Sequence, residues 1–211
     1  REAGIPVITF DYRSQPRAAL PVMLGLLLKL FSIAGYLPDQ AKAVGVAQTA
    51  AAAATKDQAS AERLAGELAG RIPIVYGSGL TAEAARRLKG QVSENANQTA
   101  AWEVLPEQNH NALVGLEQPD GLAAMTRFVL LRTDQEHPRN TLRFEILKEL
   151  LEGKGLACSE IRAAGDGRLA QLVSVLAQGD LASVALAFRN GVDPTPVTVI
   201  AGLKERLGEA S

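Results

Sequence analysis

The sequence predicts an α/β fold, a doubly wound parallel sheet flanked by helices. Short apolar runs typical of buried strands alternate with amphipathic helical segments over much of the chain. Strands that alternate with helices predict a parallel sheet that is covered on both faces. The 211 residues, 47% of them apolar and 21% charged, are enough for one good-sized globular domain or two small ones.

The first third of the chain is predicted to be mostly helical. Ile5–Phe10 is typical of a buried strand, and because the chain runs into it straight from Arg1, we expect a cut N-terminus with something missing upstream. A helix is expected from near Arg17 to Gly35, and Gln40–Gly70 has a helical composition.

The alternating pattern occupies the rest of the chain. Four runs are predicted strands: Ile72–Tyr76, Leu113–Leu116, Phe128–Leu131 and Ala157–Ile161. Thr81 is a suitable N-cap for a helix that continues to Leu88. Three further segments are predicted helices: Leu142–Leu151, Leu169–Leu176 and Thr195–Leu207.

Composition excludes several classes of function. With 22 basic and 23 acidic residues, the net charge of −1 gives no overall attraction to nucleic acid or to an anionic membrane. Pro21 and Lys29 interrupt the apolar stretch Leu20–Tyr36, so we expect a core or interface helix there rather than a membrane span of about 20 residues. The single cysteine, Cys158, rules out a disulfide framework within the chain and fits the cytoplasm, and two histidines cannot build a cysteine/histidine zinc site.

Two segments are candidates for chemistry. Gly77-Ser78-Gly79 follows a strand and resembles a phosphate loop, but it lacks the following Lys-Ser/Thr, and a tight strand-to-helix turn explains it equally well. Ser93–Asn111 is polar and weakly periodic; it holds three glutamates and His110, which together could divide proton-transfer work, and the asparagines beside His110 could orient its ring. A solvated loop is the alternative.

Three other charged residues have simple structural explanations when taken alone. His137 precedes a predicted helix and fits an N-terminal cap. Arg17 fits a first-turn surface residue, and Lys204 fits the solvated face of a terminal helix.

Several pieces in a fixed order carry a resemblance to a known family. They are Pro16-Arg17-Ala18, the run from Ile72 to Gly79, Glu94-Asn95-Ala96, the run from Pro106 to Asn111, His137-Pro138-Arg139, and the run from Asp193 to Lys204. With these pieces the chain resembles the C-terminal part of the bifunctional phosphoglucose/phosphomannose isomerase family, whose members are built from two sugar-isomerase (SIS) domains.

The resemblance implies a fold and an activity. It implies a SIS-type, flavodoxin-like three-layer sandwich, with residues 1–71 as the end of a truncated first SIS domain plus a helical linker, and residues 72–211 as the C-terminal SIS domain. It also implies an isomerase that interconverts glucose 6-phosphate and mannose 6-phosphate with fructose 6-phosphate through a cis-enediol(ate), without metal or cofactor. A cytoplasmic homodimer with its active site at the subunit interface is expected, and neither nucleic acid nor membrane is an expected partner.

The resemblance assigns a role to four residues. Glu94 matches the base that moves the proton between C1 and C2, and Glu107 does not. His110 and Lys204 match the residues that open the sugar ring, and the family's histidine comes from the partner subunit. Arg17 matches the arginine that stabilises the enediolate, a role that suits a cation beside a developing oxyanion.

The chain also departs from the family. Asn97 stands where a lysine or a similar residue is expected, and Ala50–Ala54 is interpreted as an insertion or drift. The serine/threonine loop that holds the phosphate belongs to the first SIS domain, so we expect weak or no activity from this chain alone. The alternatives are a non-catalytic SIS module that binds sugar phosphates and regulates a partner, and a dimerisation domain built on the apolar helix Leu20–Phe31.

Overall fold

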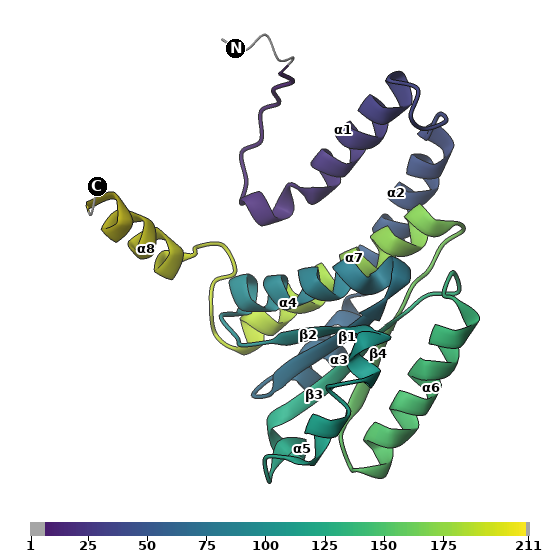
Figure 1. The fold of residues 1–211 in the computed structure, drawn as a ribbon. Coiled ribbons are helices and arrows are strands. Elements are labelled where there is room, and N and C mark those ends of the chain that lie inside the picture. Colours follow the sequence, from purple (N-terminus) through teal and green to yellow (C-terminus); the bar gives the residue numbers. More distant parts are fainter. Residues whose placement is uncertain (1–6, 210–211) are drawn as a thin grey trace. The chain divides into compact units, whose positions relative to one another are not determined.

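The structure, a computed structural model, describes residues 7–209 (Figure 1). The chain divides into two compact units, one up to Gln40 and one from Ala41 onward. Each unit is described by itself below.

The first unit consists of a 3₁₀ turn, η1 (Pro16–Ala18), and a helix, α1 (Leu20–Ile33). The predicted helix in this region is therefore confirmed. Residues 7–10 are exposed and form no strand, so the described part of the predicted strand Ile5–Phe10 is wrong, and residues 5 and 6 lie outside the described residues. A strand requires a hydrogen-bonded neighbour, and residues 7–10 have none within the described part of their own unit.

A four-stranded parallel sheet forms the centre of the second unit. Its strands are β1 (Ile72–Ser78), β2 (Ala101–Leu105), β3 (Thr126–Arg132) and β4 (Cys158–Arg162). Their order across the sheet is β2-β1-β3-β4, and every neighbouring pair is parallel. The chain moves outward from β1 in both directions, so the predicted doubly wound parallel sheet is confirmed.

Seven helices complete the described part of the second unit. They are α2 (Ala41–Lys56), α3 (Gln58–Leu68), α4 (Ala82–Ala96), α5 (Leu122–Met125), α6 (Pro138–Gly153), α7 (Arg168–Arg189) and α8 (Thr198–Glu209). Three short 3₁₀ turns belong to the same unit: η2 (Gly79–Thr81) between β1 and α4, and η3 (Glu107–Asn109) and η4 (Val114–Glu117) between β2 and α5. The helices predicted over 40–70, 81–88, 142–151, 169–176 and 195–207 are confirmed.

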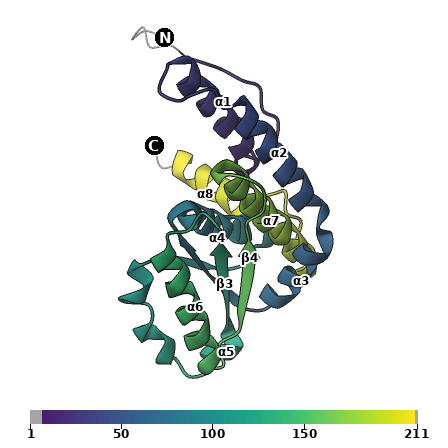
Figure 2. The ribbon, with the colours of Figure 1, turned by 90° about the vertical axis from the view of Figure 1, so that its right-hand side faces the viewer.

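Helices cover both faces of the sheet, and Figure 2 shows α6 on one side of the strands and α3, α4 and α7 on the other. The larger core lies under α3, α4 and α7, where alternate sheet residues such as Val75 and Val129 are fully buried. The second core lies under α6 and contains Tyr76 and Phe128 from the sheet with Phe144 from the helix. Neighbouring residues of a strand therefore contribute to different cores, because successive side chains of a pleated strand point to opposite faces of the sheet.

One of the described helices, α7, is long and apolar enough by length and composition to cross a membrane. Nearly half of its apolar window is buried inside the domain, where it packs against α2, α3 and α4. The apolar composition of α7 is thus that of a core helix.

Two sequence predictions about the middle of the chain are wrong. Leu113–Leu116 is not a strand, because η4 occupies this region and Leu113 and Leu116 both face the α6 core. Their spacing of three residues matches the 3₁₀ repeat. In addition, strand β2 lies inside the polar stretch Ser93–Asn111, for which the sequence predicts no strand, and Trp102 is exposed on this edge strand.

Candidate active site

Different candidate residues lie at the two ends of the parallel strands, which are called here the amino edge and the carboxyl edge of the sheet. Helix α4 begins after the carboxyl end of β1, and the chain enters the parallel strand β2 at its amino end, so α4 must return the chain to the amino edge of the sheet. Glu94 lies in the last turn of α4 and is half-buried. Glu94 is therefore placed at the amino edge of the sheet.

Buried contacts with α7 fix the helix turn that carries Glu94. Asn95 Nδ2 donates to Ser183 Oγ at 2.8 Å, and Ser183 Oγ donates to the carbonyl oxygen of Asp180 at 2.7 Å. Asn95 and Ser183 are both buried, so this short chain of bonds is shielded from water. Asn97 ends the helix in the left-handed conformation with φ of 51°, which an asparagine tolerates better than most residues. The departure at Asn97 thus has a structural explanation as the C-cap of α4.

A side-chain clamp joins three helix ends at this amino edge. Asn190, at the end of α7, donates through Nδ2 to the carbonyl oxygen of Ala96 at 3.0 Å and to Gln98 Oε1 at 2.9 Å. Gln98 Nε2 in turn donates to the carbonyl oxygens of Leu68 at 2.9 Å and Arg71 at 2.7 Å. The segment that leads to α8 therefore leaves the domain from the same edge as Glu94.

Lys204 and His110 are both exposed. Lys204 lies beyond the segment that leaves from the amino edge of the sheet, and His110 lies at the carboxyl edge. Lys204 lies on α8, none of whose described residues is buried. His110 caps the end of η3, directly after the carboxyl end of β2. The neighbouring amides do not orient its ring as was hypothesised, because Asn109 Nδ2 donates to Gln108 Oε1 at 2.8 Å and Asn111 Nδ2 to Glu107 Oε1 at 3.4 Å.

A single chain does not bring Glu94 and His110 together. Strand β2, five residues long, runs from the edge near Glu94 to the edge of His110, and at a rise of about 3.3 Å per residue it spans roughly 16 Å. Arg17 belongs to the first unit, where it is half-buried in η1. Within the second unit, Glu94 and the segment carrying Lys204 start from the amino ends of the strands, whereas His110 follows the carboxyl end of β2.

Sequence reasoning missed a polar cluster at the carboxyl ends of β1 and β3. These two strands flank the point where the strand order reverses, a common ligand position in α/β sheets. Ser78 Oγ donates to Glu136 Oε1 at 3.3 Å and accepts from Asn140 Nδ2 at 2.5 Å. Thr81 lies at the predicted N-cap position, but its hydroxyl donates to the carbonyl oxygens of Ser78 at 3.0 Å and Leu131 at 3.2 Å. The cluster joins residues far apart in the sequence, which leave no motif.

The cluster favours the tight-turn explanation of Gly77-Ser78-Gly79 over the phosphate loop. Gly79 has φ of +48°, and a Cβ atom built there would lie 3.3 Å from Glu136 Oε1. A carboxylate so close to the turn repels a phosphate group. His137 performs the predicted capping role, since its Nδ1 accepts a hydrogen bond from the Arg139 amide at 3.2 Å.

Comparisons with known proteins point to one family. The model of the bacterial phospho-glucose isomerase C-terminal SIS domain matches residues 57–207. A protein from Caldicellulosiruptor bescii named bifunctional phosphoglucose/phosphomannose isomerase is 35% identical over 98% of this chain, and one of the same name from Aquifex aeolicus is 30% identical over 98%. The chain spans 63% of the length of each of these relatives.

Solved structures agree with the fold. A crystal structure of a glucose-6-phosphate isomerase-like protein from Thermus thermophilus superposes with a TM-score of 0.53 at 29% identity, covering 72% of this chain and 47% of that one. The C-terminal domain of glucosamine-fructose-6-phosphate aminotransferase from Francisella tularensis gives a TM-score of 0.61 at 16% identity, covering 80% of this chain and 51% of that one. The second likeness shows the fold alone.

Proposed function

The chain belongs to the family of bacterial phospho-glucose isomerase C-terminal SIS domains, and from that membership we propose that the protein is an aldose–ketose isomerase. Its reaction interconverts glucose 6-phosphate and mannose 6-phosphate with fructose 6-phosphate through a cis-enediol(ate). The observation that carries the proposal is the family match over residues 57–207, which includes Glu94, His110 and Lys204.

The proposed mechanism divides the chemistry among four side chains. Glu94 moves the proton between C1 and C2, and the buried bonds of Asn95 support it by fixing the turn that presents its carboxylate. His110 and Lys204 open the sugar ring as acid and base. Arg17 stabilises the negative charge of the enediolate, which lowers the barrier to removing a weakly acidic C–H proton.

The proposed assembly is a homodimer in which the site takes His110 from the second subunit. The separation of Glu94 from His110 by the length of β2 supports this arrangement, because one chain alone does not supply both groups to one substrate. Exposed apolar side chains on the outer face of α6, namely Leu142, Ile146 and Leu150, support self-association of the second unit.

The remaining parts of the proposal concern the rest of the protein. We place the sugar-phosphate grip in a first SIS domain, with residues 1–71 as its end plus a linker and residues 72–211 as the C-terminal domain. This boundary stays a prediction; the second compact unit begins at Ala41 and the family match at residue 57. We infer a cytoplasmic location from the metabolic role. The alternative function is a non-catalytic module that binds sugar phosphates.

Deuterium exchange tests the proposal. Fructose 6-phosphate is incubated in D₂O with the full-length protein, and proton NMR follows exchange at C1 together with the appearance of glucose and mannose 6-phosphates. We expect exchange that falls by about 10²- to 10⁴-fold in Glu94→Gln and stays unchanged in Glu83→Gln, an exposed glutamate at the start of the same helix. Phosphosugar binding without exchange would favour the binding module, and normal exchange in Glu94→Gln would remove Glu94 as the base.

A further inference from the structure

The turn that carries Glu94 is the end of a helix, and a neighbouring helix supplies a partner that this end lacks. The last four carbonyl groups of a helix have no partner within the helix, and Ala96 is the last residue of α4. The Ala96 carbonyl oxygen accepts from Asn190 Nδ2 at 3.0 Å, and Asn190 directly follows α7. The last turn of α4 is therefore attached to the end of α7 two residues after Glu94.

The amide of Gln98 extends this side-chain clamp to two further elements. Gln98 Oε1 accepts from Asn190 Nδ2 at 2.9 Å. Gln98 Nε2 donates to the carbonyl oxygens of Leu68, the last residue of α3, at 2.9 Å and of Arg71, directly before β1, at 2.7 Å. Both amides thus donate both of their hydrogens, and the clamp ties the end of α4 to α3, β1 and α7.

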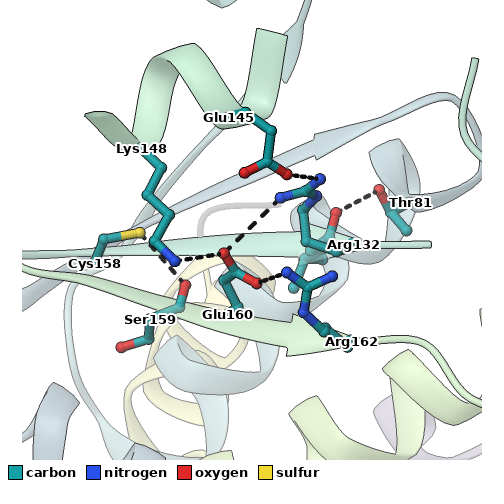
Figure 3. Close-up of polar contacts among 9 residues, drawn as sticks. Thr81, Arg132, Glu145, Lys148, Cys158, Ser159, Glu160 and Arg162 are labelled. Carbon is teal, nitrogen blue, oxygen red and sulfur yellow. Dashed lines mark hydrogen bonds and ion pairs between the residues drawn. The ribbon is translucent and has the colours of Figure 1, made fainter. Parts of the chain in front are cut away.

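The side-chain clamp carries no formal charge. Its four hydrogen bonds end on three backbone carbonyl oxygens and one amide oxygen, none of which titrates. The cluster on the edge strand β4 is different, because there the Glu160 carboxylate is shared by the cations Lys148 and Arg162 (Figure 3). Replacing Asn190 or Gln98 by alanine therefore releases the turn without removing a charge from the surroundings of Glu94.

A base that removes a proton from carbon needs a fixed position. Catalytic groups must be held to within about 0.5 Å of their productive geometry, whereas helix ends fray. Glu94 is half-buried, and the neighbouring Asn95 is bonded to Ser183 of α7 inside the domain. The side-chain clamp adds a second attachment, and the two together hold the turn of Glu94 against α7.

We propose that Asn190 and Gln98 are positioning residues, which act on the isomerase reaction through Glu94. They hold the last turn of α4 so that the carboxylate meets the carbon atoms between which the proton moves. This inference rests on the proposed role of Glu94 as the base. Neither amide touches the substrate in this arrangement, so both set the rate of proton transfer rather than the affinity for the sugar phosphate.

Steady-state kinetics of Asn190→Ala in the full-length protein test the proposal. With fructose 6-phosphate, we expect kcat to fall by about 10- to 100-fold while KM stays within about twofold. The pKa values read from the pH profile of kcat should not move, because no charge is lost. Asn190 is exposed, so this variant should still fold, and Gln98→Ala should reproduce its kinetics.

Gln178→Ala is the matched control. Gln178 is another amide of α7, and its Nε2 donates to the carbonyl oxygens of Arg162 at 3.0 Å and Ser174 at 3.2 Å. Arg162 is the last residue of β4 (Figure 3), at the carboxyl edge of the sheet, whereas Glu94 lies at the amino edge. The control therefore loses two hydrogen bonds of the same kind, and its kcat should stay unchanged.

A double variant separates an action through Glu94 from a general loss of structure. If Asn190 acts through Glu94, Asn190→Ala should change the residual exchange rate of Glu94→Gln by less than about twofold. The full loss in that background would overturn the positioning role, as would an unchanged kcat in Asn190→Ala or an equal loss in Gln178→Ala.

The same measurements distinguish this proposal from the isomerase assignment. An inactive Glu94→Gln together with a normal Asn190→Ala would remove the positioning role and leave Glu94 as the base. Normal exchange in Glu94→Gln would remove the base itself, and the positioning role with it.

Discussion

Arg87 on α4 and Asp180 on α7 form a two-pronged ion pair between the helices. Arg87 Nη2 lies 2.6 Å from Asp180 Oδ2, and Arg87 Nε donates to Oδ1 at 3.2 Å. Burial raises the pKa of the Asp180 carboxyl, and the hydrogen bond from Arg87 opposes that rise. The packing of α4 against α7 partly removes the Asp180 carboxylate from water, and the ion pair with Arg87 offsets the cost of that desolvation.

Replacing Arg87 should destabilise the domain more than replacing both partners. We expect Arg87→Met to lower the free energy of unfolding by about 1–2 kcal/mol, a discounted figure because about a third of the Asp180 side chain is exposed. The double variant with Asp180→Leu should recover part of that loss, since no uncompensated charge remains. Urea denaturation measures both, and Arg86→Met serves as the exposed control. A double variant with a lower free energy of unfolding than Arg87→Met alone would contradict this account.

Gly77 should not tolerate a methyl group. A Cβ atom there would lie 2.4 Å from the carbonyl oxygen of Thr81, which is backbone and cannot rotate away. We expect Gly77→Ala to cost about 1–3 kcal/mol of unfolding free energy. Gly90, within α4, has open space around its Cβ position, so Gly90→Ala should instead gain about 0.5–1 kcal/mol. Equal changes in the free energy of unfolding of the two variants would show that the backbone near Thr81 moves away from the new methyl group at little energetic cost.

The thiol of Cys158 should react slowly in the folded protein. Burial raises its pKa to about 11, and the nearby Glu160 adds to the effect. The thiolate is the reactive form, so at about pH 8 Ellman's reagent should react roughly two orders of magnitude more slowly than with free cysteine. In concentrated guanidinium chloride the reaction should become fast. A rapid reaction in the native state would mean that β4 opens readily at the sheet edge.

Mixing two inactive variants should restore activity if His110 acts in the site of the partner subunit. Glu94→Gln and His110→Gln would each be inactive alone. In a mixed dimer, one of the two sites combines the intact Glu94 of the His110→Gln subunit with the intact His110 of the Glu94→Gln subunit. Half of the dimers in an equal mixture with free subunit exchange are mixed, so about a quarter of the wild-type rate should be recovered. No recovery would place both residues in the same chain's site, against the separation imposed by β2.

The fold could be predicted further than the site from the sequence. Strands β1 and β3 lie in the middle of the sheet, are largely buried and form apolar runs, so the sequence predicts them near their observed positions. The edge strand β4 is predicted within one residue, as Ala157–Ile161, although Ser159 and Glu160 make it half polar. The sequence does not predict β2, a five-residue edge strand in which Glu103 interrupts the apolar residues and which lies inside a polar stretch. Leu113 and Leu116 were mistaken for a strand because a short apolar run has no visible period.

The family resemblance identifies the candidate residues and implies that the histidine comes from the partner subunit, but local sequence alone does not place Glu94 and His110 at opposite strand ends. Local sequence placed Glu94 and His110 in one polar stretch, which suggested proximity. The intervening strand β2 sends them to opposite edges, and only pairing with β1, which lies well before β2 in the sequence, determines that. The Ser78–Glu136 contact was likewise invisible, since it depends on the neighbouring ends of β1 and β3.

The strand order also sets how the domain is able to assemble during synthesis. Each neighbouring pair of strands is parallel, so none of them can form as a local hairpin behind the ribosome. Helix α7, made after the whole sheet, packs against α2, α3 and α4 and completes the larger core. Until it emerges, those three helices carry apolar faces without their packing partner. Synthesis that stops before Arg168 therefore leaves a nascent chain with exposed apolar surface that is prone to aggregation, rather than a smaller folded domain.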